Sequence, residues 1–410
     1  MDSPSSFLAP NGRLAARIPG WEPRPQQIVM ADLVAAAIDQ KKHAIIEAGT
    51  GTGKSLAYLI PAVLAATADQ AHQEENQPEQ QQQTRHEDQK SEKTNEKRPR
   101  RIVIATHTIA LQEQLVKKDI PVVSAVMPHE FSAVLVKGRG NYISLRRMEL
   151  AKEREGSLFQ YDEEVAELDG LLEWSGNTRD GSLADLPTIP RSSVWDEVHS
   201  DSGNCMGRTC PRYSDCHYFA ARRRMNNAQV LVVNHALFFS DLALRRSGVS
   251  LLPEYDIVIL DEAHMVESVA SDHLGVGLSS IAAERLLSRL YNERTNRGLL
   301  VHYQLDDLRP DVIQARRIAE DFFSGIIHAV ADRGDGPWRI LEPNLVPNTL
   351  GEVLLSLGRK IRKASDRLSS DAERQDFQSL ADRLTSQAGS IRFWLEQDDP
   401  GSVWWGELAN

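Results

Sequence analysis

The sequence predicts an α/β fold in which a parallel sheet is joined to a largely helical domain. Short apolar runs recur before Met265, and each ends in glycine or polar residues; they lie before Gly49 and at residues 102–105, 133–136, 230–233 and 257–260. Continuous apolar runs of this length are typical of parallel strands that are covered on both faces. After Met265 the apolar residues instead recur at helical spacing, which predicts packed helices.

Composition narrows the class of protein. The 410 residues are 41% hydrophobic and carry a formal net charge of −11, which fits globular domains with cores of their own. The acidic balance argues against a basic coat over the whole surface, although local patches can still bind phosphate. We expect no signal peptide and no membrane span, because the start lacks a basic segment before an apolar core and no apolar run reaches about 18 residues. These features predict a cytoplasmic protein.

A glycine-rich stretch, EAGTGTGKS at residues 47–55, lies between an apolar run and an apolar helix. Its glycines let backbone N–H groups converge on anionic oxygens at a helix N-terminus, which predicts a phosphate-binding loop. In such loops the lysine, here Lys54, reaches the β- and γ-phosphates of ATP, and the hydroxyl of the next residue, here Ser55, binds Mg²⁺. Ala48 stands where a first glycine is common, and a simple turn between strand and helix is the alternative. The nucleotide-binding residues predicted from the loop are Gly49, Thr50, Gly51, Thr52, Gly53, Lys54 and Ser55.

An acidic pair, Asp261 and Glu262, follows the apolar run at residues 257–260. Ligands bind at the carboxyl ends of parallel strands, so we expect this pair close to the phosphate-binding loop. There Asp261 can hold the same Mg²⁺ as Ser55, and Glu262 can orient or deprotonate the attacking water. The alternative is an ordinary helix N-cap followed by an acid in the first turn.

All three cysteines, Cys205, Cys210 and Cys216, lie in an insertion at residues 141–227. They are too few for a disulfide framework. Thiolates at their C-x4-C-x5-C spacing can hold an iron–sulfur cluster or, with a histidine such as His217, a zinc ion. The alternative is three free thiols in a loop. A run of three arginines, which predicts either a phosphate-binding patch or a solvated helix face, follows as Arg222, Arg223 and Arg224.

Two further segments bear on the organisation of the chain. Residues 67–100 contain almost no apolar side chains and predict a disordered insertion. Gln27 lies near the start of a predicted helix that precedes the phosphate-binding loop. It is either a reader of the adenine edge of ATP or an ordinary polar residue of a first helical turn.

Taken in order, the blocks RPQQ, EAGTGTGKS, ATHTIALQEQL, KGRGNYIS, VVNHALFFSDLALR and LDEAH, with the three cysteines, resemble the DinG branch of the DinG/XPD-like superfamily 2 DNA helicases. The resemblance covers roughly residues 10–270. It implies the P-loop NTPase sheet of a RecA-like motor domain, a cysteine-containing insertion and a helical arch domain. It also implies ATP-driven 5′ to 3′ movement on single-stranded DNA, with unwinding of duplex, forked or R-loop structures in repair and replication.

The resemblance assigns roles to individual residues as well. Gln27 is similar to the adenine-reading glutamine of the family, with Arg24 nearby, and Lys54 and Ser55 are similar to its phosphate and Mg²⁺ residues. His264 completes a DEAH box with Asp261 and Glu262, and the resemblance implies that it links hydrolysis to the parts that move DNA. The segment implied to grip single-stranded DNA consists of Thr106, His107 and Thr108.

The sequence departs from the family pattern in two places. Iron–sulfur members of the family have a cysteine where this chain has Ser144, so a stable 4Fe–4S cluster is not favoured. A three-thiolate cluster, a serine-ligated cluster, a zinc site and a metal-free fold all stay open. In addition, the helical region is followed by neither a Ser-Ala-Thr block nor a Gln-x-x-Gly-Arg-x-x-Arg block, which we assign to the second motor domain of the family.

We therefore expect no second motor domain in these residues. The expected segments are a leader at 1–23, motor domain 1 at 24–140 and 228–270, a cluster-type insertion at 141–227 and a helical arch domain at 271–400. The expected protein is a monomer that needs a second motor domain for full activity, because an arginine from across the cleft is worth roughly a thousandfold or more in related NTPases. The alternative function is a truncated, non-translocating, ATP-gated single-stranded DNA-binding module.

Overall fold

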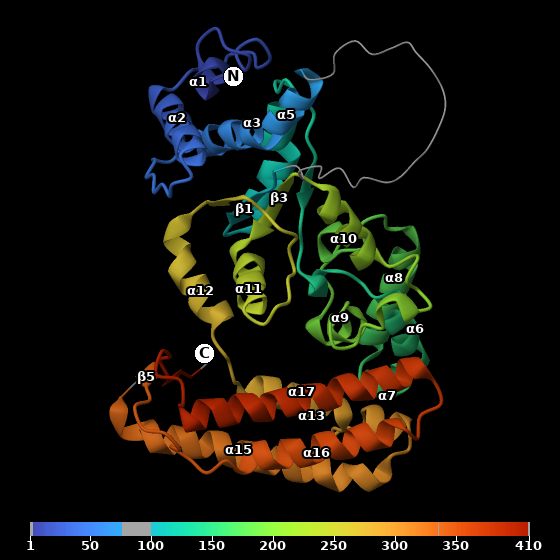
Figure 1. Cartoon of the computed structure of the whole chain (residues 1–410). Helices are drawn as coiled ribbons and strands as arrows, with labels where there is room; N and C mark the ends of the chain where they lie inside the picture. The colour runs from blue at the N-terminus through green and yellow to red at the C-terminus, as the bar shows by residue number, and fades with distance from the viewer. Residues whose placement is uncertain (1–2, 76–99, 335, 409–410) are drawn as a thin grey trace, which may run out of the picture. The chain divides into compact units, whose positions relative to one another are not determined.

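The computed structural model describes residues 3–75, 100–334 and 336–408, and the chain divides into two compact units (Figure 1). The first unit consists of residues 1–137 and 221–275, and the second of residues 138–220 and 276–410. In the part of the chain that is described, no helix is long and apolar enough to cross a membrane.

The first unit is built on a parallel sheet with the strand order β2–β3–β1–β4. In its register, Ile102 of β1 pairs with Val230 of β3 on one side and with Ile257 of β4 on the other. The predicted α/β class with a parallel sheet is therefore confirmed. The strands are β1 (Ile102–Thr106), β2 (Ala133–Leu135), β3 (Val230–Asn234) and β4 (Ile257–Leu260).

Helices cover both faces of this sheet. They are α1 (Pro4–Leu8), α2 (Pro25–Asp39), α3 (Lys54–Glu75), α4 (Ile109–Gln114), α5 (Ile120–Ser124), α11 (His235–Arg245) and α12 (Val266–Leu274), with a π-helical turn η1 (Leu115–Asp119) between α4 and α5. Ile102 and Ile104 of β1 point into a core with α1, α2, α3 and α5, whereas Val103 and Ala105 point into a core with α11 and α12. All four side chains are fully buried, which explains why the strand is continuously apolar.

The strand predicted before the phosphate-binding loop is absent. Residues 42–49 are irregular, and Ile45 is fully exposed. Among the described residues the sheet ends at β4, where Val258 and Leu260 are also exposed. Backbone N–H and C=O groups of a strand need a neighbouring strand. The apolar run at residues 43–47 has no such neighbour here, so its pattern alone does not produce a strand.

Two other segments of the first unit also differ from expectation. The predicted leader is part of the core, because Phe7, Leu8 and Leu14 are fully buried. Helix α3 continues to Glu75, so residues 67–75 are helical where disorder was predicted. Alanine, glutamine and glutamate favour propagation of a helix that has already formed. The rest of the predicted insertion, residues 76–99, lies outside the described residues.

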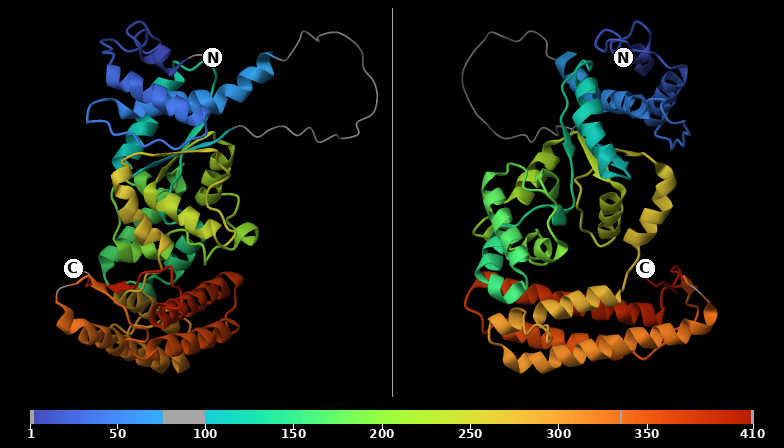
Figure 2. Two further views of the ribbon diagram at one scale, coloured as in Figure 1. Left: turned by 60° about the vertical axis from the view of Figure 1, so that its left-hand side comes forward. Right: turned by 180° about the vertical axis from the view of Figure 1, so that it is seen from behind.

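The second unit is mainly helical, and its long helices α13, α15, α16 and α17 lie side by side (Figures 1 and 2). The predicted apolar stripes face its core, where Leu350, Leu357 and Ile361 of α16 and Phe377 and Leu384 of α17 are buried. A short antiparallel pair, β5 (Trp338–Arg339) and β6 (Trp405–Gly406), accompanies them. The helices are α6 (Leu145–Glu153), α7 (Glu155–Leu158), α8 (Asp162–Asn177), α9 (Ser192–Val198), α13 (Ser280–Leu290), α14 (Leu299–His302), α15 (Arg309–Val330), α16 (Thr349–Ser365) and α17 (Asp371–Glu396); α10 (His217–Asn227) contains the boundary between the units.

A buried charge network joins the cysteine-containing insertion to the helical domain in this one unit. Asp376 of α17 is 2% exposed, and its carboxylate lies 2.6 Å from Arg154 and 3.8 Å from Arg146. Burial alone would raise the pKa of Asp376, but the surrounding guanidinium groups, with Arg154 first, bring it below its ordinary value. Arg147 is buried beside them, and burial followed by the charge of Arg289 lowers its pKa to about 10. The two predicted domains therefore share a polar core.

We expect Asp376→Asn to lower the free energy of unfolding by about 3–5 kcal/mol, because it leaves buried guanidinium groups without their carboxylate. Denaturant unfolding followed by circular dichroism measures this loss. The folded pKa of Asp376 lies below its unfolded value of about 3.9, so its contribution is fully present above that value. It is lost as the pH falls through the folded pKa.

The matched control is Asp382→Asn on the same helix, since Asp382 forms an exposed ion pair with Arg362. Exposed pairs contribute at most about 1 kcal/mol. Equal destabilisation by the two substitutions would contradict the importance of the buried network.

Candidate active site

The glycine-rich loop of the first unit has a backbone conformation that requires glycine. Gly51 and Gly53 have φ angles of 80° and 81°, in the left-handed region. A Cβ atom on Gly53 would also lie 2.2 Å from Nε2 of Gln27. Helix α3 begins at Lys54, directly after the loop, so the loop ends at a helix N-terminus, as phosphate-binding loops do.

Two side chains from the start of α2 hold this loop in place. Gln27 donates a hydrogen bond from Nε2 to the carbonyl oxygen of Gly53 at 2.8 Å, and Arg24 donates one to the carbonyl oxygen of Gly51. Gln27 is 2% exposed, and its Oε1 atom is buried without a hydrogen-bond partner in the described residues. A buried acceptor of this kind fits the amino group of adenine. The adenine contact of Gln27 and Arg24 stays a prediction, while their support of the loop is an additional role.

The phosphate-binding lysine and the acidic pair meet at the end of β4. Lys54 Nζ lies 3.4 Å from Glu262 Oε1, and both side chains are about 30% exposed. His264 Nδ1 lies 3.5 Å from Glu262 Oε2. Glu262 has a φ of 53°, a left-handed conformation that is costly for a residue with a Cβ atom and recurs at functional sites. Of the predicted catalytic residues, Lys54, Glu262 and His264 are thus brought together directly.

Asp261 belongs to a second, more buried group of oxygen atoms. Its Oδ2 atom accepts a hydrogen bond from the Tyr58 hydroxyl at 3.1 Å. Burial, followed by the charge of Asp261, raises the pKa of Tyr58 well above its ordinary value. Asp119 is a nearby buried acid whose pKa is raised by burial, and its charge also raises the pKa of Tyr58. Hydroxyl and carboxylate oxygens are the ligands that Mg²⁺ prefers, so this set fits the predicted cation.

The residues implied to grip DNA differ in exposure. Thr106 is fully buried and donates a hydrogen bond to the carbonyl oxygen of Thr108 at 3.4 Å, whereas His107 and Thr108 are exposed. The Thr108 hydroxyl caps α4 by accepting a hydrogen bond from Leu111 N. The His107 ring faces His235 at 6.1 Å between centroids. DNA binding by these residues stays a prediction.

Sequence reasoning missed three side chains of this region: Tyr58, Asp119 and His235. Tyr58 follows Lys54 by one helical turn, a spacing that could have been noticed. His235 is 1% exposed, with Nε2 3.1 Å from the carbonyl oxygen of Ala105 and Nδ1 unpartnered among the described groups. Burial lowers the pKa of His235, which favours its neutral form. Asp119 and His235 reach the site only through tertiary packing, so no spacing in the sequence marks them.

The cysteines do not form a four-thiolate site. Cys205, Cys210 and Cys216 are half-buried, and Gly207 N donates a hydrogen bond to Cys205 Sγ at 3.4 Å. Burial raises the pKa of the Cys216 thiol. Ser144, at the position of the missing fourth cysteine, caps α6 by accepting a hydrogen bond from Arg147 N. A 4Fe–4S cluster takes four thiolates, so this donor set does not fit it. Within the described ranges, no group of histidine, cysteine or acidic residues is arranged to hold a metal ion.

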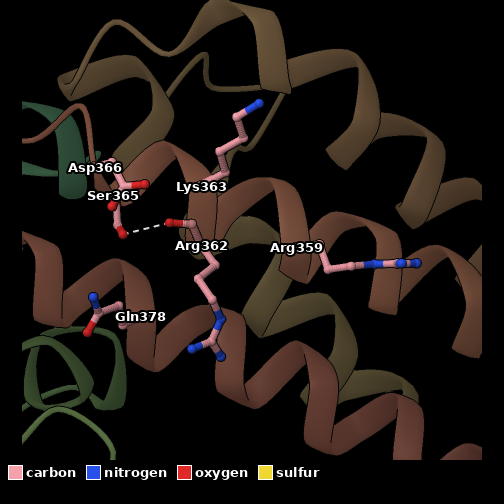
Figure 3. A pocket seen from close by; sticks show the side chains of 6 residues that line it. All are labelled: Arg359, Arg362, Lys363, Ser365, Asp366 and Gln378. Carbon is pink, nitrogen blue, oxygen red and sulfur yellow. Dashed lines mark hydrogen bonds between the residues drawn. The ribbon is translucent and has the colours of Figure 1, made fainter.

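A depression on the second unit does not form a second phosphate site. Figure 3 shows that the side chains of Arg359, Arg362 and Lys363 point in different directions instead of converging. Arg362 is already paired with Asp382, and its carbonyl oxygen accepts a hydrogen bond from the Ser365 hydroxyl at 2.6 Å. The lining residues are Arg359, Arg362, Lys363, Ser365, Asp366 and Gln378.

The fold, the site and the sequence comparisons all indicate one class of protein. The parallel sheet, the glycine-rich loop and the acidic pair define the motor domain of a P-loop NTPase. The DEAD/DEAH box helicase family model matches residues 25–145, and the DEAD_2 model matches residues 204–282. The match to a solved structure of truncated XPD covers 87% of this chain and 81% of that one, with a TM-score of 0.36 and 15% identity.

Three curated relatives with similar sequences are known by name. The ATP-dependent DNA helicase YoaA of Escherichia coli K12 is 36% identical over 275 residues, which cover 67% of this chain and 38% of YoaA. The ATP-dependent DNA helicase DinG of Photobacterium profundum is 26% identical over 392 residues, 89% of this chain and 52% of that protein. The 3′-5′ exonuclease DinG of Bacillus subtilis is 30% identical over 279 residues, 68% of this chain and 26% of that protein. This chain is similar to DinG-like superfamily 2 helicases, and it spans between 26% and 52% of the length of these relatives.

We expect Gly53→Ala to weaken binding of a fluorescent ATP analogue by tenfold or more, about 1.4 kcal/mol, because alanine is strained at φ 81° and its methyl group would collide with Gln27. Gly176→Ala in α8, outside the loop, is the control, since a Cβ atom there meets nothing within 4 Å and its φ is not left-handed. Comparable losses of ATP-analogue binding in both variants would contradict the conclusion that the loop requires glycine at residue 53.

Proposed function

We propose that this chain is the motor domain of a DinG-type DNA helicase, which couples ATP hydrolysis to 5′ to 3′ movement on single-stranded DNA and to duplex unwinding in DNA repair or replication. The observation that carries the proposal is the meeting of Lys54 and Glu262, 208 residues apart, at 3.4 Å beside Asp261. A phosphate-binding lysine next to a candidate general base is the arrangement that ATP hydrolysis requires. The names of two relatives, each an ATP-dependent DNA helicase, support DNA as the substrate.

The ion pair between Lys54 and Glu262 supports a simple order of events. Both side chains are partly exposed, and such pairs contribute at most about 1 kcal/mol, so ATP phosphates can draw Lys54 away. Glu262 is then free to accept a hydrogen bond from the attacking water. Mg²⁺, when bound through Ser55 and Asp261, supplies neutralisation of the phosphate charge. His264, 3.5 Å from Glu262, is placed to sense this change.

The proposed partners are single-stranded and forked DNA and a second motor domain. Thr106 ends β1, and His107 and Thr108 follow it at the same edge of the sheet as the acidic pair, which supports DNA contact close to the ATP site. A second motor domain would complete the ATP site with an arginine, worth about a thousandfold or more in related NTPases. We propose a monomer that acts in the cytoplasm.

We expect Glu262→Gln to keep nucleotide binding and to lower ATP hydrolysis about 100-fold or more, because it removes the base that activates water. The assay contains single-stranded DNA and, as a separate polypeptide, the second motor domain of a DinG-type relative. Glu267→Gln, which changes an exposed acid in the first turn of α12, is the control and should hydrolyse like the parent protein. Unchanged hydrolysis in Glu262→Gln would contradict the assignment of the base.

The same assay separates the helicase from the alternative, an ATP-gated single-stranded DNA-binding module. A helicase motor predicts hydrolysis that DNA stimulates once the second motor domain is present. ATP-dependent binding of DNA without hydrolysis, even with that domain, would favour the binding module.

For the cysteines we propose a structural role without a stable 4Fe–4S cluster, because Ser144 replaces the fourth thiolate. Protein purified without oxygen should therefore be colourless and contain little iron. A brown protein with about four iron atoms and four sulfides per chain, the content of one 4Fe–4S cluster, would contradict this proposal.

A further inference from the structure

The antiparallel pair β5–β6 forms a short two-stranded ribbon in the second unit, and its two faces differ. Arg339 pairs with Trp405 in its register, and Ile340 N donates a hydrogen bond to the Trp404 carbonyl oxygen at 2.8 Å, which continues the pairing by one residue. Successive side chains of a strand point to opposite faces, and residues directly opposite each other share a face. Arg339 and Trp405 therefore lie on one face, and Ile340 and Trp404 lie on the other.

The face with Ile340 and Trp404 packs against α17 at one end of the long helices (Figure 1). Ile340 is 2% exposed, and the Trp404 ring meets the Phe393 ring of α17 edge-on, with 4.8 Å between centroids. The Trp394 indole N–H, also from α17, donates a hydrogen bond to the Trp405 carbonyl oxygen at 3.3 Å. Helix α17 thus fixes the backbone of the ribbon from this side.

The other face, called the outer face below, carries an exposed indole ring beside an exposed guanidinium group. Trp405 is 46% exposed, and its ring meets no other ring of the described residues. The exposed Arg339 side chain, directly across from it, forms no hydrogen bond or ion pair within the described ranges. Arg333 brings a second guanidinium group, because its Nη1 atom donates a hydrogen bond to the Arg339 carbonyl oxygen at 3.3 Å. By the same alternation Leu341 and Val403 belong to this face, and they are 71% and 56% exposed.

The size and chemistry of the outer face favour a nucleic-acid base over a protein partner. Stable protein interfaces bury roughly 1,200–2,000 Å², more than one indole ring and two aliphatic side chains offer. Only two residues of each strand are paired, so the ribbon is too short to bind an added strand along its edge. An aromatic ring next to a free arginine is instead the combination that binds single-stranded nucleic acid, where the ring stacks on a base and the cation contacts phosphate.

Acidic side chains near the ribbon limit where phosphate can lie. None of them pairs with Arg339 among the described residues, so the positive charge of Arg339 is available on the β5 side of Trp405. A strand that stacks on Trp405 would therefore place its phosphate over β5. The exposed acids near the ribbon are Asp332, Glu342, Asp398 and Glu407.

We propose that the outer face of β5–β6 is a contact site for single-stranded DNA, in which a base stacks on the Trp405 ring and a neighbouring phosphate meets the Arg339 guanidinium group. Such a contact is independent of sequence, because every base has a π face. The inference rests on the proposed function, from which it takes single-stranded DNA as the ligand.

The test measures binding of a short fluorescently labelled oligothymidine to residues 1–410 by fluorescence anisotropy. We expect Trp405→Ala to weaken binding about tenfold, which is in the range that loss of one stacked base causes. Trp405→Phe keeps an aromatic face and should retain most of the affinity. Val403→Ala, which shortens an exposed apolar side chain on the same face, is the matched control and should bind like the parent protein. Melting temperatures close to that of the parent show that the variants are folded.

An abasic strand of the same length separates stacking from charge, because it keeps the phosphates and lacks the bases. If a base stacks on Trp405, Trp405→Ala should lose affinity for oligothymidine but not for the abasic strand. Arg339→Ala should weaken binding of both strands. It should also reduce the slope of log K against log salt by about 0.7, the value for one phosphate contact on a single strand.

Three outcomes would overturn the inference. The first is parent-like binding of oligothymidine by Trp405→Ala, and the second is an equal loss for both strands in that variant. The third is a loss of self-association in Trp405→Ala with unchanged DNA binding, which would make the outer face a contact between protein chains. A parent protein that binds neither strand, with or without ATP, would instead overturn the proposed function itself and this inference with it.

Discussion

The parallel register of β1 against its two neighbours is the constraint on which the candidate site depends. Ala105 pairs with Leu260, and Asp261 N donates a hydrogen bond to the Ala105 carbonyl oxygen at 2.9 Å, so the acidic pair begins where β1 ends. Thr106 pairs with Asn234 on the other side, which places His235 at the same edge. A slip of one residue would turn each side chain to the opposite face of the sheet. Segments distant in the sequence therefore converge on one edge because their strands are parallel and in this register.

The sequence predicts those parts of the fold and site that carry a local signal. Strands β1 to β4 were predicted from apolar runs, and Lys54, Ser55 and the acidic pair from fixed spacings. Residues 43–47 show the same apolar pattern but form no strand. The pattern reports only the preference of the side chains, whereas a strand also needs a neighbouring strand to bond with its backbone. Asp119 lies outside prediction for a related reason: its side chain is buried by tertiary packing, which no spacing in the sequence marks.

In the second unit, two segments that the sequence predicts as separate domains share one core. The cysteine-containing insertion and the helical region differ in composition, and the sequence separates them, yet both contribute to one buried network around Asp376. Composition reports the hydrophobicity of a segment but not which buried charges it neutralises. The same segment shows how one substitution changes a site: Ser144 caps α6, a role that serine fills well, where the family's iron–sulfur members have a cluster ligand. The insertion can thus keep its fold without the full set of thiolates.

The most direct test is a crystal structure of residues 1–410 with Mg²⁺ and a non-hydrolysable ATP analogue. We expect the analogue's phosphates to lie in the loop, Lys54 to have left Glu262 for them, and Gln27 still to hold Gly53. We also expect the cation to lie against Ser55 and Asp261. A nucleotide bound elsewhere, or a phosphate-free loop with Lys54 still paired to Glu262, would contradict the assignment of the ATP site.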